Sequence, residues 1–282
     1  MRLKKQYLII FSLFLQCNLW GQSKESTHHL ADRMYAQNQF EEALYLYQRV
    51  AYFSKPQADA NVLGRIADCF YAQADFTRAI EYYDHAYFAT SDTQEKTNYL
   101  FGKMGTYLEI KNYHFVLVEL LGEDFPTNIQ NHYSKELYLA AAYFGLEQFE
   151  DAGKHFVEAI PAERKEARQQ IESIFNEPKN FSRPKPKVAF ILSAILPGAG
   201  QVYAGNPGAG INSLILTGSF VGLVLYLSVR INPIDAILTG LPWFQRYYQG
   251  GFDQAEISAE HARELRRNKH YQEALQIIGS SL

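Results

Sequence analysis

Residues 188–230 contain no charged side chain before the final Arg230, and this uncharged stretch dominates the hydrophobic pattern of the chain. Residues 188–203 and 211–229 are almost entirely apolar, and the glycine-rich segment 205–210 separates them. A membrane-spanning helix needs about 20 apolar residues. The pattern therefore predicts a transmembrane helical hairpin. The alternative is a buried core hairpin of a soluble protein, but such an element would normally present polar residues on its outer face.

The first 22 residues have the three parts of a secretory signal peptide. Cationic residues are followed by the apolar stretch 7–15, and residues 19–21 could form a cleavage site that ends in a small residue. Residues 13–17 resemble a lipobox ending at Cys17, but Gln16 stands where a small residue is usual. Cleavage, lipidation of Cys17 and an uncleaved anchor helix all remain open. In each case the leader predicts that the following segment is exported.

Between residues 28 and 161 the chain repeats a pattern of large and small apolar positions. In each unit an aromatic residue precedes a small residue by three positions, and a second large apolar residue follows four positions later. The small position recurs every 36 or 37 residues. This spacing predicts antiparallel helix pairs in which small residues permit close approach. The four units contain Phe40, Ala43 and Tyr47; Phe76, Ala79 and Tyr83; Tyr113, Val116 and Leu120; and Phe149, Ala152 and Phe156. A second set, Ala31, Ala67, Met104 and Ala140, lies upstream in each unit.

These positions resemble the tetratricopeptide repeat, whose usual unit is about 34 residues. The resemblance covers about half of the chain, although the signature Trp is missing and Val116 stands where Ala is usual. It implies an all-α helical solenoid over residues 28–176, in which residues 162–176 form a capping helix. It also implies a concave groove, formed by the first helices, that binds peptides or partner proteins. An ordinary solvated face is the alternative for each candidate groove residue: Arg33, Gln37, Arg65, Tyr71 and Lys103.

Residues 177–187 form a predicted linker that is rich in proline and in positive charge. These cationic side chains would lie well against lipid headgroups. They conflict with the leader, however, because the positive-inside rule places the cationic side of a membrane segment in the cytoplasm. We give precedence to the leader, since a translocated domain carries its downstream flank with it.

The most specific string in the chain is PGAGQVYAG, residues 197–205. It resembles the Pro-Gly-x-Gly-Gln-x-Tyr-x-Gly motif of small two-helix membrane domains that are TM2-like in pattern. Similar domains often follow tetratricopeptide-like repeats in envelope proteins of Gram-negative bacteria. The resemblance covers roughly residues 186–255, and it implies a type of membrane domain to which no activity is assigned.

Each residue of this motif has an expected structural role. A proline kinks a helix, glycines permit the close approach of a second helix, and a glutamine near lipid seeks a hydrogen-bond partner, here Asn212 or Tyr203. A plain structural turn is the bland alternative. A dinucleotide-binding fingerprint fails, because no acidic residue follows about 20 positions later. The motif residues are Pro197, Gly198, Gly200, Gln201, Tyr203 and Gly205.

The last part of the chain is divided into two predicted segments. Residues 231–252 combine apolar, aromatic, proline and charged residues, which favours an interfacial or re-entrant helix over a clean third span. Residues 253–282 form a predicted helical tail. Within it, Leu265, Tyr271, Ala274 and Ile278 reproduce the register of the repeats, which suggests another helix pair over residues 254–278 docked near the solenoid. An even number of membrane spans would then be required.

Composition narrows the chemistry that this chain can perform. A net charge of −3 gives no electrostatic argument for nucleic acid, and 282 residues suffice for about two domains. The eight histidines lack metal-site spacing, and no nucleophile elbow is present. Cys69, among apolar neighbours, is expected to be a small core residue. No enzyme activity, metal or cofactor is therefore expected.

The sequence as a whole predicts a membrane-anchored, tetratricopeptide-type scaffold or adaptor of the bacterial cell envelope. Its solenoid would bind proteins or peptides in the periplasm, and its hairpin would contact lipid in the inner membrane. The alternative is a subunit of a membrane assembly in which the glycine-rich hairpin is the functional part. An enzyme or transporter with an unrecognised site is the least favoured reading.

Overall fold

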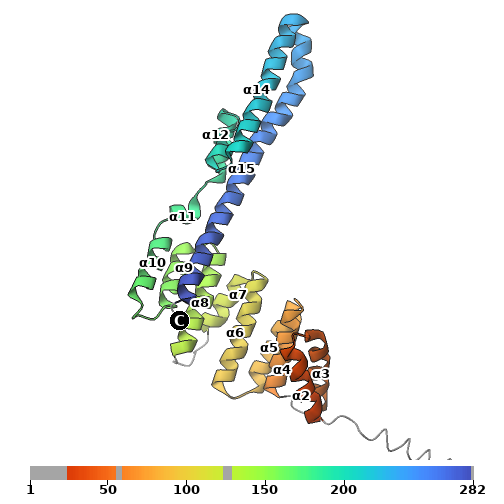
Figure 1. The fold of residues 1–282 in the computed structure, drawn as a ribbon, viewed down its shortest axis with the longest axis vertical. Coiled ribbons are helices and arrows are strands. Elements are labelled where there is room, and N and C mark those ends of the chain that lie inside the picture. Colours follow the sequence, from red (N-terminus) through yellow and green to blue (C-terminus); the bar gives the residue numbers. More distant parts are fainter. Residues whose placement is uncertain (1–23, 55–58, 123–128, 281–282) are drawn as a thin grey trace, which may run out of the picture. The chain divides into compact units, whose positions relative to one another are not determined.

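The computed structural model describes residues 24–54, 59–122 and 129–280, and these residues form fourteen helices and no strand (Figure 1). The all-α class is thereby confirmed. The predicted leader and Cys17 lie outside the described residues. The chain divides into two compact units, Met1–Glu147 and Gln148–Leu282.

The first unit is a row of short helices in which each helix packs against the next one along the chain. The helices follow the sequence units two by two, with α2 and α3, α4 and α5, and α6 and α7 in successive units. Neighbouring helices pack both within a unit, as α4 and α5 do, and between units, as α5 and α6 do. Their bounds are α2 Lys24–Ala36, α3 Phe40–Phe53, α4 Ala60–Ala72, α5 Phe76–Ala89, α6 Thr93–Glu109, α7 Tyr113–Gly122 and α8 Ile129–Gly145.

The turns between helices share two features: a residue with a positive φ after the first helix of each unit, and an aspartate at the start of several helices. The second residue after the first helix of each unit has a positive φ, a left-handed conformation that L-residues rarely adopt; these residues are Asn38, Ala74, Lys111 and Glu147. These positions recur at the 36- to 37-residue period of the apolar pattern. Asp59, Asp75 and Asp92 accept a backbone N–H at the starts of α4, α5 and α6, which satisfies donors that have no partner within the helix. The turns therefore repeat along with the core.

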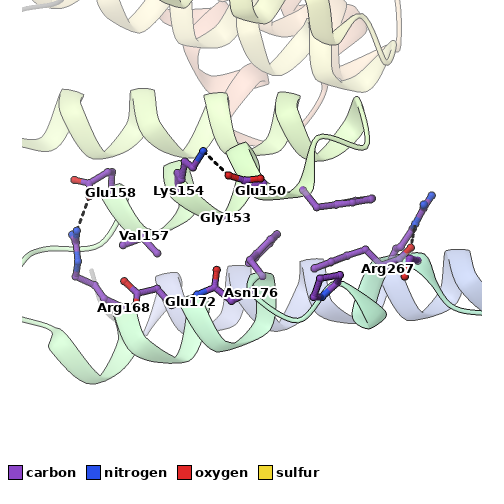
Figure 2. Close-up of a pocket in the computed structure, with 14 residues that line it drawn as sticks. Glu150, Gly153, Lys154, Val157, Glu158, Arg168, Glu172, Asn176 and Arg267 are labelled. Carbon is purple, nitrogen blue, oxygen red and sulfur yellow. Dashed lines mark hydrogen bonds and ion pairs between the residues drawn. The ribbon is translucent and has the colours of Figure 1, made fainter.

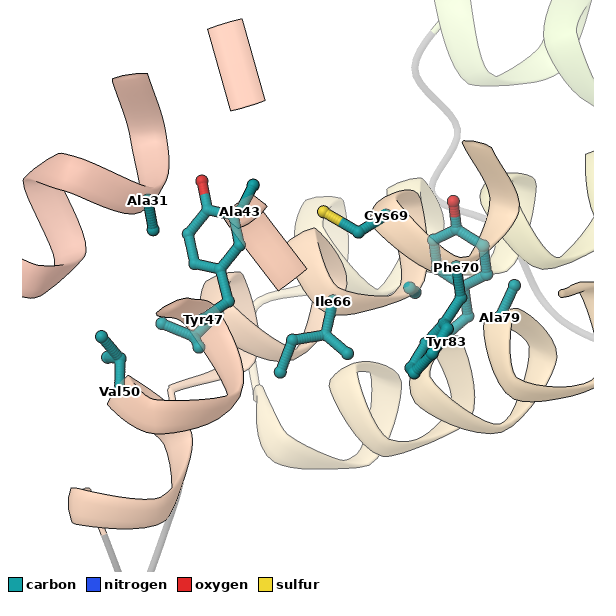
Figure 3. Packing of buried hydrophobic residues seen from close by; sticks show 11 residues of the cluster. Ala31, Ala43, Tyr47, Val50, Ile66, Cys69, Phe70, Ala79 and Tyr83 are labelled. Atoms are coloured by element: carbon teal, nitrogen blue, oxygen red, sulfur yellow. The ribbon is translucent and has the colours of Figure 1, made fainter. Parts of the chain in front are cut away.

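The small positions of the pattern are the points of closest packing. All eight of them, Ala31, Ala43, Ala67, Ala79, Met104, Val116, Ala140 and Ala152, are fully buried. Around those in α2–α5, larger side chains such as Tyr47 and Phe70 fill the space between helices (Figure 3). Cys69 lies in the same cluster as a free, buried thiol, in agreement with its expected role in the core.

Two core tyrosines are anchored at their polar ends. The Tyr47 hydroxyl donates a hydrogen bond to Asp32 over 2.7 Å, and the Tyr83 hydroxyl donates to Asp68 over 2.8 Å. Both bonds join the second helix of a pair to its first helix. The sequence pattern treated these tyrosines as large apolar residues and did not predict their partners. Burial, followed by the interaction with the aspartate, raises the pKa of both phenols above the ordinary value.

The second unit is organised around one long helix. Helix α15, Pro233–Gly279, has 47 residues and is therefore about 70 Å long. Every other helix of this unit from α10 onward packs against it. The bounds are α9 Phe149–Glu158, α10 Lys165–Phe175, α11 Lys179–Ser182, α12 Pro186–Ile195, α13 Ala199–Tyr203 and α14 Pro207–Arg230.

The expected hairpin differs from the structure in its first arm. Residues 188–203 are not one helix, because α12 ends at Ile195 and the chain turns before α13 begins. Ten residues of helix span about 15 Å, half of the hydrocarbon thickness of a bilayer. Among the described residues, α14 is the one helix long and apolar enough to cross a membrane. Its antiparallel neighbour is the first part of α15 (Figure 1).

The tail and the linker also differ from expectation. A helix pair over residues 254–278 is wrong, since α15 runs through this range without a break. The linker 177–187 contains the short helix α11. The capping segment forms α10, and its three apolar residues Ile171, Ile174 and Phe175 are buried, as the pattern predicts.

The tyrosine–aspartate bonds lead to a prediction about alkaline pH. Above pH 10 an unfolded chain loses phenolic protons that the folded chain keeps, because the folded pKa values of Tyr47 and Tyr83 are raised. The unfolded state then binds fewer protons, so stability is complete below pH 10 and falls as the pH rises further. At pH 7, Tyr47→Phe or Tyr83→Phe should cost about 1–2 kcal/mol through the lost hydrogen bond, and this deficit should shrink above pH 10.

Thermal unfolding followed by circular dichroism between pH 7 and 11 measures both effects. Tyr45→Phe is the matched control, because Tyr45 is exposed on the same helix as Tyr47. A deficit that stays constant across this pH range would contradict the prediction.

Candidate functional site

The five candidate groove residues of the first unit lie in different environments. Arg33 and Gln37 are exposed at the end of α2. Tyr71, on α4, is partly exposed, and its hydroxyl donates to Glu109 over 3.4 Å. The Arg65 guanidinium lies 4.5 Å from the centre of the Tyr35 ring and 3.5 Å from Asp68. These four can contribute to a surface, but two of them already contact other side chains.

Lys103 occupies an interior position on α6. It is 7% exposed, and its Nζ lies 2.7 Å from Asp84 Oδ1 and 2.7 Å from Glu119 Oε1. Burial lowers the pKa of this ammonium, but hydrogen bonds and the charges of Asp84 and Glu119 outweigh burial and raise it. Lys103 is therefore a charged bridge between α5, α6 and α7.

Within the first unit, large apolar side chains are exposed mainly on α3, α5 and α7, the second helices of the sequence units. Tyr45 and Val118 are more than two-thirds exposed, and they hold equivalent positions two units apart. Tyr52 and Phe88 are likewise equivalent and exposed. Sequence reasoning placed the binding surface on the first helices and missed this set. The signal that could have found it is an apolar residue two positions after the small residue in the first and third units, and nine positions after it in the first and second units.

The glycine motif of the second unit forms the break between α12 and α13. Pro197 was expected to kink a continuous helix, but it lies in the turn between two helices, because proline lacks an N–H and restricts the residue before it. Gly198 follows with φ of +91°. A Cβ at Gly198 would overlap the carbonyl oxygen of Gly210 on α14, and one at Gly200 would overlap that of Ala189 on α12.

Not every motif glycine serves close approach. In Gly205 a Cβ would meet no atom of the described residues within 4 Å, yet φ is +87°. Its role is the left-handed turn that leads into α14. The predicted role of Gly205 in close packing is therefore wrong, whereas those of Gly198 and Gly200 are confirmed.

Gln201 is the polar centre of the motif. It is 1% exposed, and its Oε1 accepts from the Ser193 hydroxyl over 2.8 Å, while its Nε2 donates to the Gly251 carbonyl over 2.6 Å. The expected partners, Asn212 and Tyr203, are therefore replaced by a serine of α12 and a backbone oxygen of α15. The Tyr203 hydroxyl instead accepts from the Lys185 N–H. Gln201 thus joins three helices.

The same region satisfies the backbone that the helix break exposes. Gly200 N donates to the Ser193 hydroxyl oxygen over 2.9 Å, and the Tyr248 hydroxyl of α15 donates to the Ala194 carbonyl near the end of α12. A broken helix leaves carbonyls and N–H groups without helical partners. These bonds supply partners to backbone groups within an apolar part of the chain.

A groove of about 850 Å³ lies in the second unit, between α9, α10, α11 and the last part of α15 (Figure 2). Its floor is apolar, with Val157 from α9 and Phe175 from α10. Its rim is charged: Lys154 pairs with Glu150 at 3.0 Å, and Arg168 pairs with Glu158 at 2.7 Å. An apolar floor with a charged rim suits a protein or peptide surface.

Comparison with known proteins assigns no family and no function to this chain. No protein-family model, no curated protein and no solved structure matches the chain. Within residues 24–54, 59–122 and 129–280, no group of three or more His, Cys, Asp or Glu side chains is placed to hold a metal ion.

The surroundings of Gly200, in the motif, and of Gly218, in α14, predict opposite effects of a Gly→Ala substitution. Gly200→Ala should lower the melting temperature of the detergent-purified chain, because its Cβ would force α13 away from α12. Gly218→Ala, inside α14, should be neutral or stabilising by about 0.5–1 kcal/mol, since alanine favours the helix and the added Cβ would meet no described atom within 4 Å. Differential scanning fluorimetry compares the two variants. Equal effects would contradict the packing role of Gly200.

Proposed function

We propose that the chain is a membrane-anchored adaptor of the bacterial cell envelope that binds partner proteins through its paired helices. The exported part would be a tetratricopeptide-type solenoid in the periplasm, and α14 would hold it in the inner membrane. The protein would act by placing a partner at the membrane and would perform no chemistry of its own.

The observation that carries this proposal is the continuity of α15. Its first part packs against α14, and its last part packs against α10 and α11. Arg267 donates from Nε to the Phe181 carbonyl over 2.8 Å, and the Tyr271 ring contacts that of Phe156 on α9. One helix thus links the candidate membrane span to α9, the second helix of the fourth sequence unit, and to α10 and α11. A force or position imposed at either end would be transmitted through it.

Repetition along the first unit supports a binding role. The small core positions and the left-handed turn residues recur at one period, which is how stacked helix pairs build an extended surface. Tyr45 and Val118 then lie at equivalent places on that surface, both largely exposed. The second and fourth units have Glu81 and Lys154 at this position, so the exposed apolar side chains that favour protein contact here belong to the first and third units.

The membrane arrangement follows from the pairing of α14 with α15. If α14 crosses the bilayer, its packing against α15 would make the first part of α15 return beside it, in place of the interfacial helix predicted for residues 231–252. Among the described helices, however, α14 is the one that is itself long and apolar enough to span. Residues 233–252 would cover about 30 Å, the thickness of the hydrocarbon region. Trp243 and Tyr247 belong to this arm, and Arg246 could extend its charge toward the headgroups. The tail would then lie on the same side as α10 and α11.

The second candidate function is a subunit of a membrane assembly in which the glycine motif is the functional part. The buried Gln201 network favours it, because a broken helix with buried polar groups is more than a simple anchor requires. Under this reading the paired helices would only dock the motif region to its assembly.

Capture of partners from native membranes distinguishes the two candidates. We expect proteins crosslinked to the tagged chain to be lost with the double variant Tyr45→Glu, Val118→Glu and retained with Gln201→Leu. Gln48→Glu, on the same helix as Tyr45, controls for added charge. Loss with Gln201→Leu alone, with retention in the double variant, would favour the membrane assembly and contradict the adaptor.

Cysteine labelling tests the return of α15 through the membrane. The starting variant lacks Cys17 and Cys69, and one cysteine is introduced at a time by Ser182→Cys, Asn232→Cys or Ser280→Cys. Spheroplasts of each variant are treated with a maleimide that does not cross the membrane. Ser182→Cys and Ser280→Cys should react from the outside, and Asn232→Cys should react only after lysis. Reaction of Asn232→Cys and Ser280→Cys from the same side would show that α15 does not return.

A further inference from the structure

A small cavity of about 230 Å³ lies between α5, α6 and α7 in the first unit. Aromatic rings and charged groups line it together, among them Tyr87, Phe88, Tyr99, Asp84, Lys103 and Glu119. Pockets for drug-sized ligands measure roughly 300–1,000 Å³. This cavity is smaller, so its size suits a single side chain or a small amine.

The charged groups of the cavity have an excess of negative charge. Lys103 contacts one oxygen of Asp84 and one oxygen of Glu119, both at 2.7 Å. One ammonium therefore faces two carboxylates. The side chains of Asp84 and Glu119 are 39% and 26% exposed, and each carboxylate offers about four acceptor positions. Both can accept a further donor that enters the cavity from solvent.

The rings add a second attraction for a cation. Tyr87 and Phe88 pack edge to face with their centres 5.2 Å apart, and the face of an aromatic ring attracts positive charge. Lys96 Nζ already lies 5.2 Å from the centre of the Tyr87 ring, so the ring offered to an incoming cation is that of Phe88, which is 79% exposed. Lys96 does not line the cavity. Aromatic faces beside carboxylates make a site that favours a guanidinium or an ammonium.

The charge of the surrounding unit points to the same class of ligand. Residues 24–147 contain ten Lys or Arg against seventeen Asp or Glu, a net charge of −7, although the whole chain carries only −3. An acidic unit steers basic partners toward it. An acidic peptide would instead meet repulsion over most of this surface.

We propose that the cavity between α5, α6 and α7 receives an arginine side chain from a basic segment of a partner protein. The guanidinium would bind the second oxygens of Asp84 and Glu119 and stack against the aromatic wall, while Lys103 keeps its contact with the first oxygen of each. This inference rests on the proposed adaptor function and names the chemistry of the partner. A partner lysine would meet the same groups with poorer geometry, since only a guanidinium offers a planar fork of donors.

Binding of short fluorescent peptides to the full chain in nanodiscs tests the site. The peptides are alike in a Gly/Ser background and contain one central arginine, lysine or citrulline. We expect arginine to bind best and citrulline, its neutral isostere, to bind at least about tenfold more weakly, since a hydrogen bond between charged groups contributes about 1.5–3 kcal/mol. Equal binding of the arginine and citrulline peptides, or binding of none, would overturn the proposal.

Variants show whether binding occurs in this cavity. Asp84→Asn should weaken the arginine peptide about tenfold, and Glu81→Gln, an exposed acid on the same helix, should leave binding unchanged. Because Asp84→Asn could also disturb Lys103, Phe88→Ala is the second variant. Phe88 is 79% exposed, so the fold should tolerate its loss while the peptide binds more weakly. Equal effects of Glu81→Gln and Asp84→Asn would mean unspecific attraction to an acidic surface and would overturn the site.

Two further outcomes separate this inference from related ones. If arginine ethyl ester binds as tightly as the peptide, the cavity takes a free small cation, and a partner segment as occupant is contradicted. If the peptide fails to bind while Tyr45→Glu, Val118→Glu still abolishes partner capture, the cavity proposal falls and the adaptor function stands.

Discussion

Close packing of small residues against α15 is the constraint on which the second unit depends. Ala189 of α12, Ala204 after α13, and Ala255 and Ala259 of α15 form one buried cluster. None of them adds more than a methyl group, so the helix backbones can come near enough for backbone and side-chain polar groups to meet. Any larger side chain here would separate Gln201 from the Gly251 carbonyl. The polar contacts of the motif are thus a consequence of small residues on another part of the chain.

That packing also explains why a helix can be broken inside an apolar segment. In an apolar environment, every exposed N–H and carbonyl needs a partner from the protein. The break at Pro197 is tolerated because Ser193 and Tyr248 supply such partners, and Gln201 holds the Ser193 hydroxyl in place. The glycine motif and the small residues Ala255 and Ala259 of α15 therefore depend on each other, because the helix break needs the close approach that these alanines permit.

Features determined by residues close together in the sequence could be predicted, and features determined by distant residues could not. The helix pairs were predictable, because Ala43 and Ala79 recur at a fixed spacing and burial acts on that local period. The partner of Gln201 was not, since Gly251 lies 50 residues away and no spacing rule links the two. Lys103 was misjudged for a similar reason: its environment is set by Asp84 and Glu119 on two other helices.

The continuous tail helix was missed because the prolines and charges of residues 231–252 and the repeat-like register of residues 254–278 indicated two separate segments. Two local features of the sequence also argue against one helix. Pro242 removes one helical hydrogen bond, and Gly250 with Gly251 weakens the helix. Tertiary packing outweighs both, since Gly251 is where Gln201 and Ser213 approach α15.

The repeat-like register of the tail has a physical meaning even though no helix pair forms there. Ala274 and Ile278 are buried, whereas Leu265 is 57% exposed, so only the last turns of α15 behave as the register predicts. In the first two sequence units the second large position is a tyrosine bonded to an aspartate. In the fourth it is Phe156, fully buried, with the Tyr271 ring beside it. The end of the same helix that packs against α14 thus lies beside α9, the second helix of the fourth sequence unit, next to the predicted capping helix α10. One helix therefore packs against α14 near its start and against α10 and α11 near its end, so a substitution that loosens either contact should also weaken the other.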